Sequence, residues 1–338
     1  MRLVRFSTFG ENHVSAMIAC LLLFLLIFPQ LIFPQPAAAQ AEPRARELEA
    51  PGPAGPLRGT WLWPTNEAPQ VLILPGSGPV DRDGFGPDGR GHAAYRLLAE
   101  GLAAANVATL RIDKRGLAGS AGAGDGYAVS LEAYAGDTRA WIEVLRRESG
   151  APCVWLLGHS EGGLIALKTA QRPEGICGLI LVGTPGRPVQ QVLREQVASL
   201  PGYAPLLPDF DAVVAELEAG RQVDYADLDP HLRPLFQPVI QDYLIDLFSH
   251  DPTALAAGYG GPMLILQGGE DLQVGLADAE ALAAAAPQAE LTVLPAVNHV
   301  LKVPKDDSRR ANHATYFDAE LPLAPGVVAA IADFVRSR

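Results

Sequence analysis

The chain has 338 residues, of which 49% are hydrophobic and 19% are charged, and its formal net charge at pH 7 is −12. This is the composition of a globular protein, and it excludes a disordered or collagen-like chain. The 38 acidic residues outnumber the 26 Lys and Arg, which excludes binding to a nucleic-acid backbone by charge, because such binding needs a positive surface.

Residues 1–41 have the order typical of a secretory signal peptide. Arginines near the start precede an apolar run over 16–28, and small residues of the A-x-A type follow at 37–39. The run is shorter than the roughly 20 residues that cross a bilayer. We expect cleavage on export, a periplasmic or extracellular protein, and membrane contact only through this segment during export. The alternative is an uncleaved anchor, because 31–33 extend the apolar stretch.

Residues 42–58 carry four prolines and lack any period, which predicts a linker before the fold. From residue 59, short apolar runs alternate with longer segments of helical period. The runs cover 71–74, 107–112, 154–157, 179–182, 263–266 and 291–294, and the helical segments cover 93–105, 131–147, 163–170, 277–286 and 327–335. Such an alternation is typical of parallel strands buried on both faces. The predicted fold class is α/β, with a mostly parallel central sheet and helices on both faces.

Residues 186–257 interrupt this alternation and predict an inserted helical cap, with helices at 190–200 and 238–248. The cap divides the fold into a first part, 59–185, and a second part, 258–338. Its apolar side chains either wall a substrate pocket or form a small core of their own. They are Leu206, Leu207, Phe210, Leu235, Phe236, Tyr243 and Phe248.

The three cysteines are too few for a zinc framework or a disulfide scaffold. Cys20 lies in the signal segment. Cys153 and Cys177 begin two strands that we expect to be neighbours. The pattern leaves open whether they form a disulfide or remain two small buried hydrophobic residues, because strand register decides how far apart they lie.

The sequence Gly-His-Ser-Glu-Gly over 158–162 lies between a predicted strand and a predicted helix. This G-x-S-x-G pattern is typical of a strained turn that exposes a nucleophilic serine at the carboxyl edge of a sheet, with small residues where strand and helix approach. Ser160 is therefore the candidate nucleophile. The alternative is a serine that only caps the helix.

A serine nucleophile needs a base, and the base needs a carboxylate that orients it. Asp271 and His299 each follow a predicted strand downstream of Ser160. Because the carboxyl ends of parallel strands line one crevice, these residues can converge with Ser160. Glu270 is an alternative carboxylate, and His313 and His92 are alternative bases. For His159 we expect a packing role beside the nucleophile.

The oxyanion of an acyl-transfer intermediate needs backbone N–H donors. The amide of Glu161, directly after the nucleophile, is one candidate. The second is the amide of Ser77, in the loop 75–84 after the first strand, where glycines allow the required backbone geometry. A phosphate-binding loop fits less well, because Pro79 lacks an amide and the third glycine of that motif is absent.

These features together resemble an α/β-hydrolase over about residues 59–338. They are the turn at 158–162, the loop at 74–84, the sequence Arg-Ile-Asp-Lys-Arg-Gly over 111–116, Asp271, and the sequence Asn-His-Val-Leu-Lys over 298–302. Within that superfamily the chain is similar to bacterial capped serine esterases and serine aminopeptidase-like hydrolases. The resemblance implies ester, thioester or amide cleavage through a serine acyl-enzyme, with no metal and no cofactor. It also implies that Asp113 and Arg115 brace the oxyanion loop.

We therefore expect a serine hydrolase that acts on a small-molecule ester or amide. An apolar cap without an evident charged anchor favours a carboxylic ester, although Glu161 or Asp209 could bind an amine. The alternatives are an aminopeptidase or amidase, an acyl thioesterase, and a binding protein that keeps the fold without turnover. The sequence does not identify the substrate-binding residues.

Overall fold

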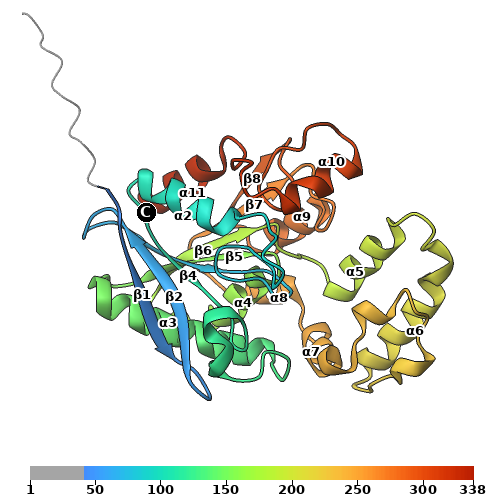
Figure 1. Ribbon diagram of the computed structural model, residues 1–338. Helices are drawn as coiled ribbons and strands as arrows, with labels where there is room; N and C mark the ends of the chain where they lie inside the picture. Colours follow the sequence, from blue (N-terminus) through green and yellow to red (C-terminus); the bar gives the residue numbers. More distant parts are fainter. Residues whose placement is uncertain (1–41) are drawn as a thin grey trace, which may run out of the picture. The chain divides into compact units, whose positions relative to one another are not determined.

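An eight-stranded sheet forms the centre of the structure, a computed structural model that describes residues 42–338 (Figure 1). The strands are β1 (Arg44–Pro51), β2 (Pro56–Trp63), β3 (Gln70–Leu74), β4 (Ala108–Ile112), β5 (Val154–His159), β6 (Ile176–Val182), β7 (Met263–Gly268) and β8 (Ala289–Leu294). They lie in the order β1-β2-β4-β3-β5-β6-β7-β8, and the six strands from β4 to β8 in that order are parallel. The predicted signal peptide lies outside the described residues.

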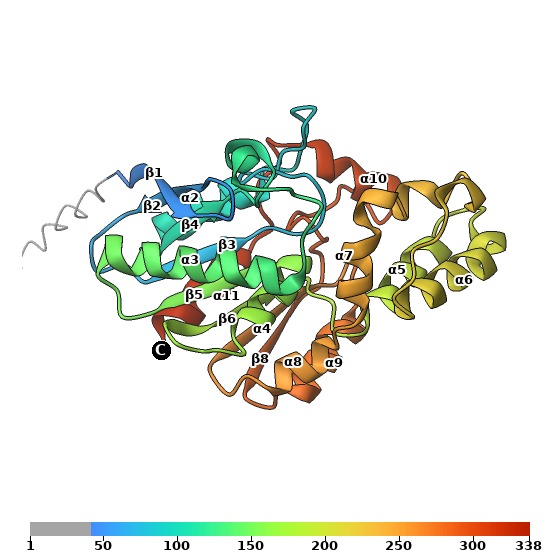
Figure 2. The ribbon, with the colours of Figure 1, turned by 90° about the horizontal axis from the view of Figure 1, so that it is seen from below.

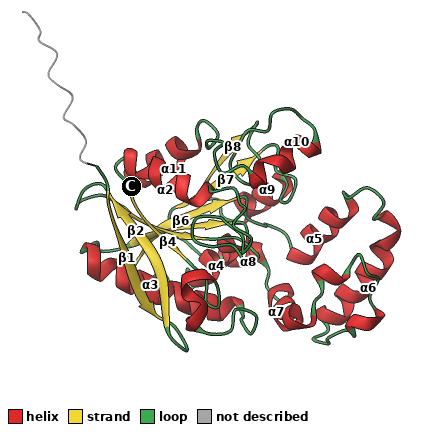
Figure 3. Cartoon of the chain, viewed as in Figure 1, coloured by secondary structure: helices red, strands yellow, loops and turns green. Residues whose placement is uncertain are grey.

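Helices cover both faces of this sheet (Figures 2 and 3). On one face, α2 (Ala94–Ala104) and α11 (Val327–Arg336) share a buried apolar cluster with Val71 and Ile73 of β3. On the other face, α3 (Leu131–Ser149), α4 (Glu161–Thr169) and α9 (Leu276–Ala285) share a second cluster with Leu72 and Leu74. Successive side chains of β3 therefore enter opposite layers, which explains its unbroken apolar run. The α/β fold class is confirmed.

The first two strands correct the sequence prediction for residues 42–58. This segment is not a linker, because β1 and β2 form an antiparallel hairpin there, with Leu48 opposite Gly59 and Ala50 opposite Leu57. Leu48, Ala50 and Leu57 are buried. The charged residues and prolines between the apolar positions concealed the alternation, and proline is tolerated at strand ends and sheet edges. The fold begins at residue 44 and not at residue 59.

The segment between β6 and β7 is helical, as predicted for 186–257. It contains α5 (Val189–Ala198), α6 (Leu207–Glu218), α7 (Pro238–Phe248) and α8 (Pro252–Ala257), with short 3-10 turns between them. In Figures 1 and 2, α5, α6 and α7 lie beyond one end of the sheet. In contrast, α8 returns to the sheet layer, where Gln171 donates a hydrogen bond to the Leu255 carbonyl at 2.9 Å.

Two aromatic residues of this inserted segment are buried against each other. Phe210 and Phe236 are fully buried, and their ring centroids lie 5.5 Å apart. These two residues therefore stabilise the segment and are not available to wall a pocket. Among residues 42–338, no helix is both long enough and apolar enough to cross a bilayer.

A disulfide between Cys153 and Cys177 joins the start of β5 to β6. These two strands are hydrogen-bonded neighbours in the sheet. Of the two possibilities that the sequence leaves open, the structure has the bridge. Because β5 leads directly into the turn that carries Ser160, the bridge fixes the opposite end of that strand.

Candidate active site

Ser160 occupies a strained turn between β5 and α4. Its backbone has φ 55° and ψ −124°, values that a residue with a side chain rarely adopts. Its amide donates to the Val182 carbonyl of β6 at 2.9 Å, which fixes the turn to the neighbouring strand. The turn needs small neighbours, because a Cβ at Gly158 would lie 2.2 Å from the Gly162 carbonyl oxygen. These are the features expected of a nucleophile turn.

Asp271 and His299 form a hydrogen-bonded pair at the ends of β7 and β8. Asp271 Oδ2 lies 2.7 Å from His299 Nδ1, and both side chains are almost fully buried. The other carboxylate oxygen, Oδ1, accepts hydrogen bonds from the amides of Gln273 and Val274 at 2.8 and 2.9 Å. The turn after β7 therefore holds the carboxylate in place, and the carboxylate in turn fixes the imidazole ring.

The alternative carboxylate and the alternative bases from the sequence do not form this pair. The carboxylate paired with His299 belongs to Asp271 and not to its neighbour Glu270. His313 is on α10 (Arg309–Ala314) and stacks on Tyr316, with ring centroids 5.8 Å apart. His92 accepts a hydrogen bond from the Ala94 amide at the start of α2.

The His299–Asp271 pair lies against the strand that neighbours the Ser160 turn. A Cβ at Gly183, directly after β6, would be 3.1 Å from Asp271 Oδ2 and 3.3 Å from His299 Nδ1. The side-chain hydrogen bond of His299 within residues 42–338 runs to Asp271, and none joins it to the Ser160 hydroxyl. Such contacts are often long before substrate binds.

A buried chain of hydrogen bonds connects the loop after β8 that carries His299, the histidine loop, to loop 75–84, which we call the oxyanion loop for its predicted role. His159 Nε2 lies 2.8 Å from the His299 carbonyl oxygen, so this nitrogen carries the proton and donates. Its Nδ1 then accepts from the Tyr95 hydroxyl at 2.9 Å, and the Tyr95 oxygen accepts from the Gly76 amide at 2.9 Å. Burial, and then the nearby His299, holds the pKa of His159 well below its ordinary value. His159 is therefore neutral and acts as a connector.

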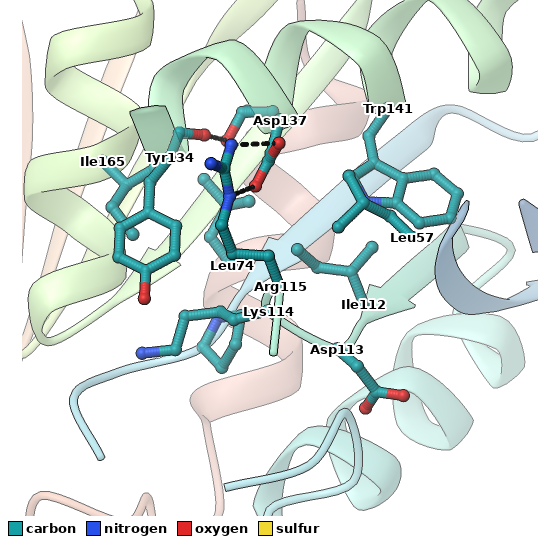
Figure 4. A pocket seen from close by; sticks show the side chains of 12 residues that line it. Leu57, Leu74, Ile112, Asp113, Lys114, Arg115, Tyr134, Asp137, Trp141 and Ile165 are labelled. Carbon is teal, nitrogen blue, oxygen red and sulfur yellow. Dashed lines mark hydrogen bonds and ion pairs between the residues drawn. The ribbon is translucent and has the colours of Figure 1, made fainter. Parts of the chain in front are cut away.

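The oxyanion loop 75–84 is attached to the residues that follow β4. Asp113 accepts from the Arg82 amide at 2.7 Å and also pairs with the Arg82 guanidinium. It therefore braces the loop, as the resemblance implies. Arg115 does not reach this loop. It pairs instead with Asp137 of α3 at 2.6 Å (Figure 4).

A second group of contacts joins this loop to the start of α4. The Ser77 hydroxyl donates to Glu161 Oε2 at 2.9 Å. Lys114 Nζ donates to the Gly76 carbonyl at 2.8 Å and lies 3.3 Å from Glu161 Oε1. The side chains of Lys114 and Glu161 are 5% and 7% exposed. The two residues predicted to supply the oxyanion amides, Ser77 and Glu161, are thus in direct side-chain contact.

Two tyrosines adjoin this group, and one comes from the inserted segment. Tyr243 of α7 packs edge to face on Tyr134 of α3, with ring centroids 6.0 Å apart. Burial, and then the Glu161 carboxylate, raises the pKa of each hydroxyl above its ordinary value. Burial and the carboxylate thus keep both hydroxyls protonated, and α7 contributes an aromatic side chain beside the site.

The sequence patterns did not identify Lys114, Tyr95 or Tyr134 as site residues, whereas Tyr243 was among the residues of the inserted segment expected either to wall a substrate pocket or to form a small core. Lys114 lies in the 111–116 sequence that carries the resemblance, and this was the one available signal. Figure 4 shows Lys114 and Tyr134 on the wall of a small cavity, with the ammonium end and the tyrosine hydroxyl extending to the same side. The sequence positions of Tyr95 and Tyr134, within ordinary helices, gave no signal.

Comparisons with known proteins identify the family of this chain. Residues 89–303 match the protein family described as serine aminopeptidase, S33. The esterase EstD of Thermotoga maritima is 27% identical over 214 residues, which are 63% of this chain and 48% of that protein. The match thus spans about half the length of that relative.

Solved structures share the fold at lower sequence identity. An esterase of Pyrococcus furiosus superposes with a TM-score of 0.54 at 16% identity, covering 87% of this chain and 91% of the other. Est1E of Butyrivibrio proteoclasticus gives 0.55 at 16% identity, with 86% and 98% covered. A thermophilic esterase of Thermogutta terrifontis gives 0.51 at 20% identity, with 86% and 98% covered. At these identities the likeness is one of fold.

Proposed function

Because the chain belongs to the serine aminopeptidase S33 family and has the α/β-hydrolase fold, we propose that this serine hydrolase cleaves a carboxylic ester through an acyl-enzyme on Ser160. The observation that carries the proposal is the 2.7 Å contact between His299 and Asp271, beside the strained turn of Ser160. A serine, a histidine and a carboxylate in that arrangement are what nucleophilic acyl transfer needs.

The first half of the reaction forms the acyl-enzyme. Asp271 accepts a hydrogen bond from the Nδ1–H of His299, so Nε2 is the basic nitrogen and takes the proton of the Ser160 hydroxyl. The serine oxygen attacks the ester carbonyl, and the Ser77 and Glu161 amides bind the resulting oxyanion. His299 then gives its proton to the leaving alcohol as the carbon–oxygen bond of the ester breaks.

The second half returns the free enzyme. Water gives a proton to His299 Nε2 and attacks the acyl carbonyl. The oxyanion is bound by the same two amides, and the serine oxygen leaves with the proton from His299. The products are the carboxylic acid and the alcohol. Asp271 stays ionised throughout and stabilises the imidazolium.

The charge distribution favours an ester over a peptide amine. Glu161 is engaged by Lys114 and Ser77, so its carboxylate is not free to bind the ammonium group of a peptide. Asp209, the other candidate anchor, is exposed on α6 and lines a surface cavity with other residues of the inserted segment. An aminopeptidase, an amidase or an acyl thioesterase remains the alternative on the same three residues.

The test measures turnover of p-nitrophenyl esters from acetyl to palmitoyl by the chain without residues 1–41. We expect Ser160→Ala and His299→Ala to lower kcat by several orders of magnitude. Ser199→Ala and His231→Ala, at exposed positions of the inserted segment, are the matched controls and should retain activity. Aminoacyl anilides and thioesters, assayed in parallel, test the alternatives. If the Ser160 and His299 variants turn over as fast as wild type, the site is wrongly assigned. If wild type shows neither turnover nor labelling by a fluorophosphonate, a binding protein is favoured.

We also propose that the protein is exported, in agreement with the N-terminal sequence pattern. The Cys153–Cys177 disulfide supports this, because disulfides persist in oxidising compartments. Cell fractionation and N-terminal sequencing of the purified protein test the proposal. A mature chain that begins near residue 42 supports it, whereas a cytoplasmic chain with an intact N-terminus would contradict it.

A further inference from the structure

The peptide group between Gly76 and Ser77 is held from its carbonyl side. Lys114 Nζ donates to the Gly76 carbonyl oxygen at 2.8 Å. That carbonyl and the Ser77 N–H belong to one planar trans peptide and point in opposite directions. The hydrogen bond from Lys114 therefore fixes the direction in which the Ser77 N–H points. This N–H is one of the two proposed oxyanion donors.

The second proposed donor is coupled to the first by side chains. Glu161 provides the other amide, and its carboxylate accepts from the Ser77 hydroxyl at 2.9 Å and lies 3.3 Å from Lys114 Nζ. Oxyanion donors act only when both lie about 2.7–3.1 Å from the same oxygen. A contact between the two donor residues themselves limits the distance between their amides.

The charges of Lys114 and Glu161 also have to balance. A buried carboxylate on a donor residue would repel the oxyanion that forms beside it, and an unpaired buried charge is costly. Lys114 compensates this carboxylate at close range, and its ammonium lies 5.4 Å from the centre of the Tyr134 ring. The pair therefore places a hydrogen-bond donor and an acceptor at the site without a net charge.

We propose that Lys114 and Glu161 are positioning residues that set the direction and separation of the two oxyanion amides, a role that rests on the proposed function. Neither side chain touches the reacting atoms. Their effect appears in the transition state, where the oxyanion exists, and hardly at all in substrate binding. Loss of either residue should therefore lower kcat and leave KM nearly unchanged.

The experiment compares Lys114→Met, Glu161→Gln, their double variant and Ser77→Ala on the p-nitrophenyl ester that wild type cleaves best. We expect kcat to fall about 100-fold in Lys114→Met, about 10-fold in Glu161→Gln and about 5-fold in Ser77→Ala, with KM changing by less than about 3-fold. The double variant has no unpaired charge, so it should recover part of the activity lost in Lys114→Met. Ser77→Thr keeps the hydroxyl and should remain closer to wild type than Ser77→Ala.

The matched control removes a neighbouring buried ion pair, Arg115–Asp137, which does not reach the oxyanion loop. The double variant Arg115→Met/Asp137→Asn should lower the melting temperature and leave kcat within about 2-fold. The rate of Ser160 labelling by a fluorophosphonate is a second readout, because phosphonylation uses the same oxyanion donors.

The outcomes separate this inference from the proposed function. If wild type cleaves the ester and Lys114→Met has the same kcat, or differs only in KM, the inference is wrong and the proposed function stands. A kcat loss that simply follows melting temperature, as in the control, would also overturn it. If wild type neither cleaves any substrate nor reacts at Ser160, the proposed function is wrong, and this inference falls with it.

Discussion

The two loops on either side of Ser160 are held by different kinds of interaction. Charged side chains hold the oxyanion loop, through Asp113 with Arg82 and through Lys114 with the Gly76 carbonyl. Side-chain amides hold the histidine loop, together with the buried Lys302, whose ammonium donates to the Asp318 carbonyl. In this loop Asn298 donates to the Thr315 hydroxyl at 2.6 Å and lies 3.3 Å from Asn312 Oδ1 of α10. Asn312 in turn donates to the Glu270 carbonyl, in the turn that carries Asp271, at 2.7 Å.

This difference decides how each loop responds to the loss of one group. Removing one partner of a buried ion pair leaves an uncompensated charge, which costs about 3–5 kcal/mol. Removing a neutral amide leaves an unpaired carbonyl or hydroxyl, which costs about 1–3 kcal/mol. The oxyanion loop should therefore be the more sensitive of the two to single substitutions.

Asp113→Ala tests the charged loop and should have the largest effect on stability. Asp113 is buried, and its carboxylate accepts from the Arg82 amide, the Arg82 guanidinium and the Gly119 amide. We expect the free energy of unfolding to fall by about 3–5 kcal/mol, measured by urea denaturation. Asp88→Ala, which breaks an exposed ion pair with Arg90, should leave the midpoint unchanged. Equal midpoints for the two variants would remove the contrast between the loops.

A pH series tests His92, a neutral side chain beside the oxyanion loop. His92 lies beside Gly84 of the oxyanion loop, and burial, with Lys302 and His299 nearby, lowers its pKa from 6.5 to about 4. Between these values the unfolded chain binds the proton and the folded one does not. The free energy of unfolding should therefore fall by about 3 kcal/mol from this residue as the pH decreases from 6.5 to 4, with no contribution above 6.5.

His92→Asn keeps an acceptor for the Ala94 amide and cannot take up this proton. Urea denaturation between pH 7.5 and 4 should show that the variant loses about 3 kcal/mol less than wild type over that range. His231→Asn, at an exposed site, should keep the wild-type profile. Parallel profiles for wild type and His92→Asn would mean that folding does not lower the pKa of His92.

Asn312→Ala tests an uncharged side-chain contact beside the histidine loop and should have the smallest effect on stability. It leaves the Glu270 carbonyl without its side-chain donor. We expect a loss of about 1–2 kcal/mol in the free energy of unfolding. Asn66→Ala, which removes an exposed acceptor for Arg44, is the control. A loss as large as that of Asp113→Ala would show that charge does not distinguish the two loops.

Much of the sheet could be predicted, because most of its parallel strands are largely apolar and buried on both faces. The edge strand β8, with sequence AELTVL, is the partly exposed exception. The strand ends that carry Ser160, Asp271 and His299 followed from the same pattern, and their catalytic role stays a prediction. The hairpin over 44–63 was missed because only one of its faces is buried and the other carries charges and prolines. A half-buried strand gives a weaker signal than one that is buried on both faces.

The connecting residues of the site could not be predicted, since their contacts join distant parts of the chain. Ser77 and Glu161 are 84 positions apart, and Tyr95 and His159 are 64 apart. No local pattern records such a pairing. Only the folded sheet, which brings the ends of β3, β4 and β5 side by side, creates these contacts.

The hairpin also determines how the protein can be attached to a surface. Arg44 pairs with Trp63 at one end of the hairpin, while Gly59 pairs with Ile112, the last residue of β4. The chain therefore enters the fold at the edge of the sheet where the parallel strands begin, and Ser160 lies at the edge where they end. A fusion partner or an immobilisation linker joined before residue 44 would be tethered at the edge of the sheet opposite to Ser160.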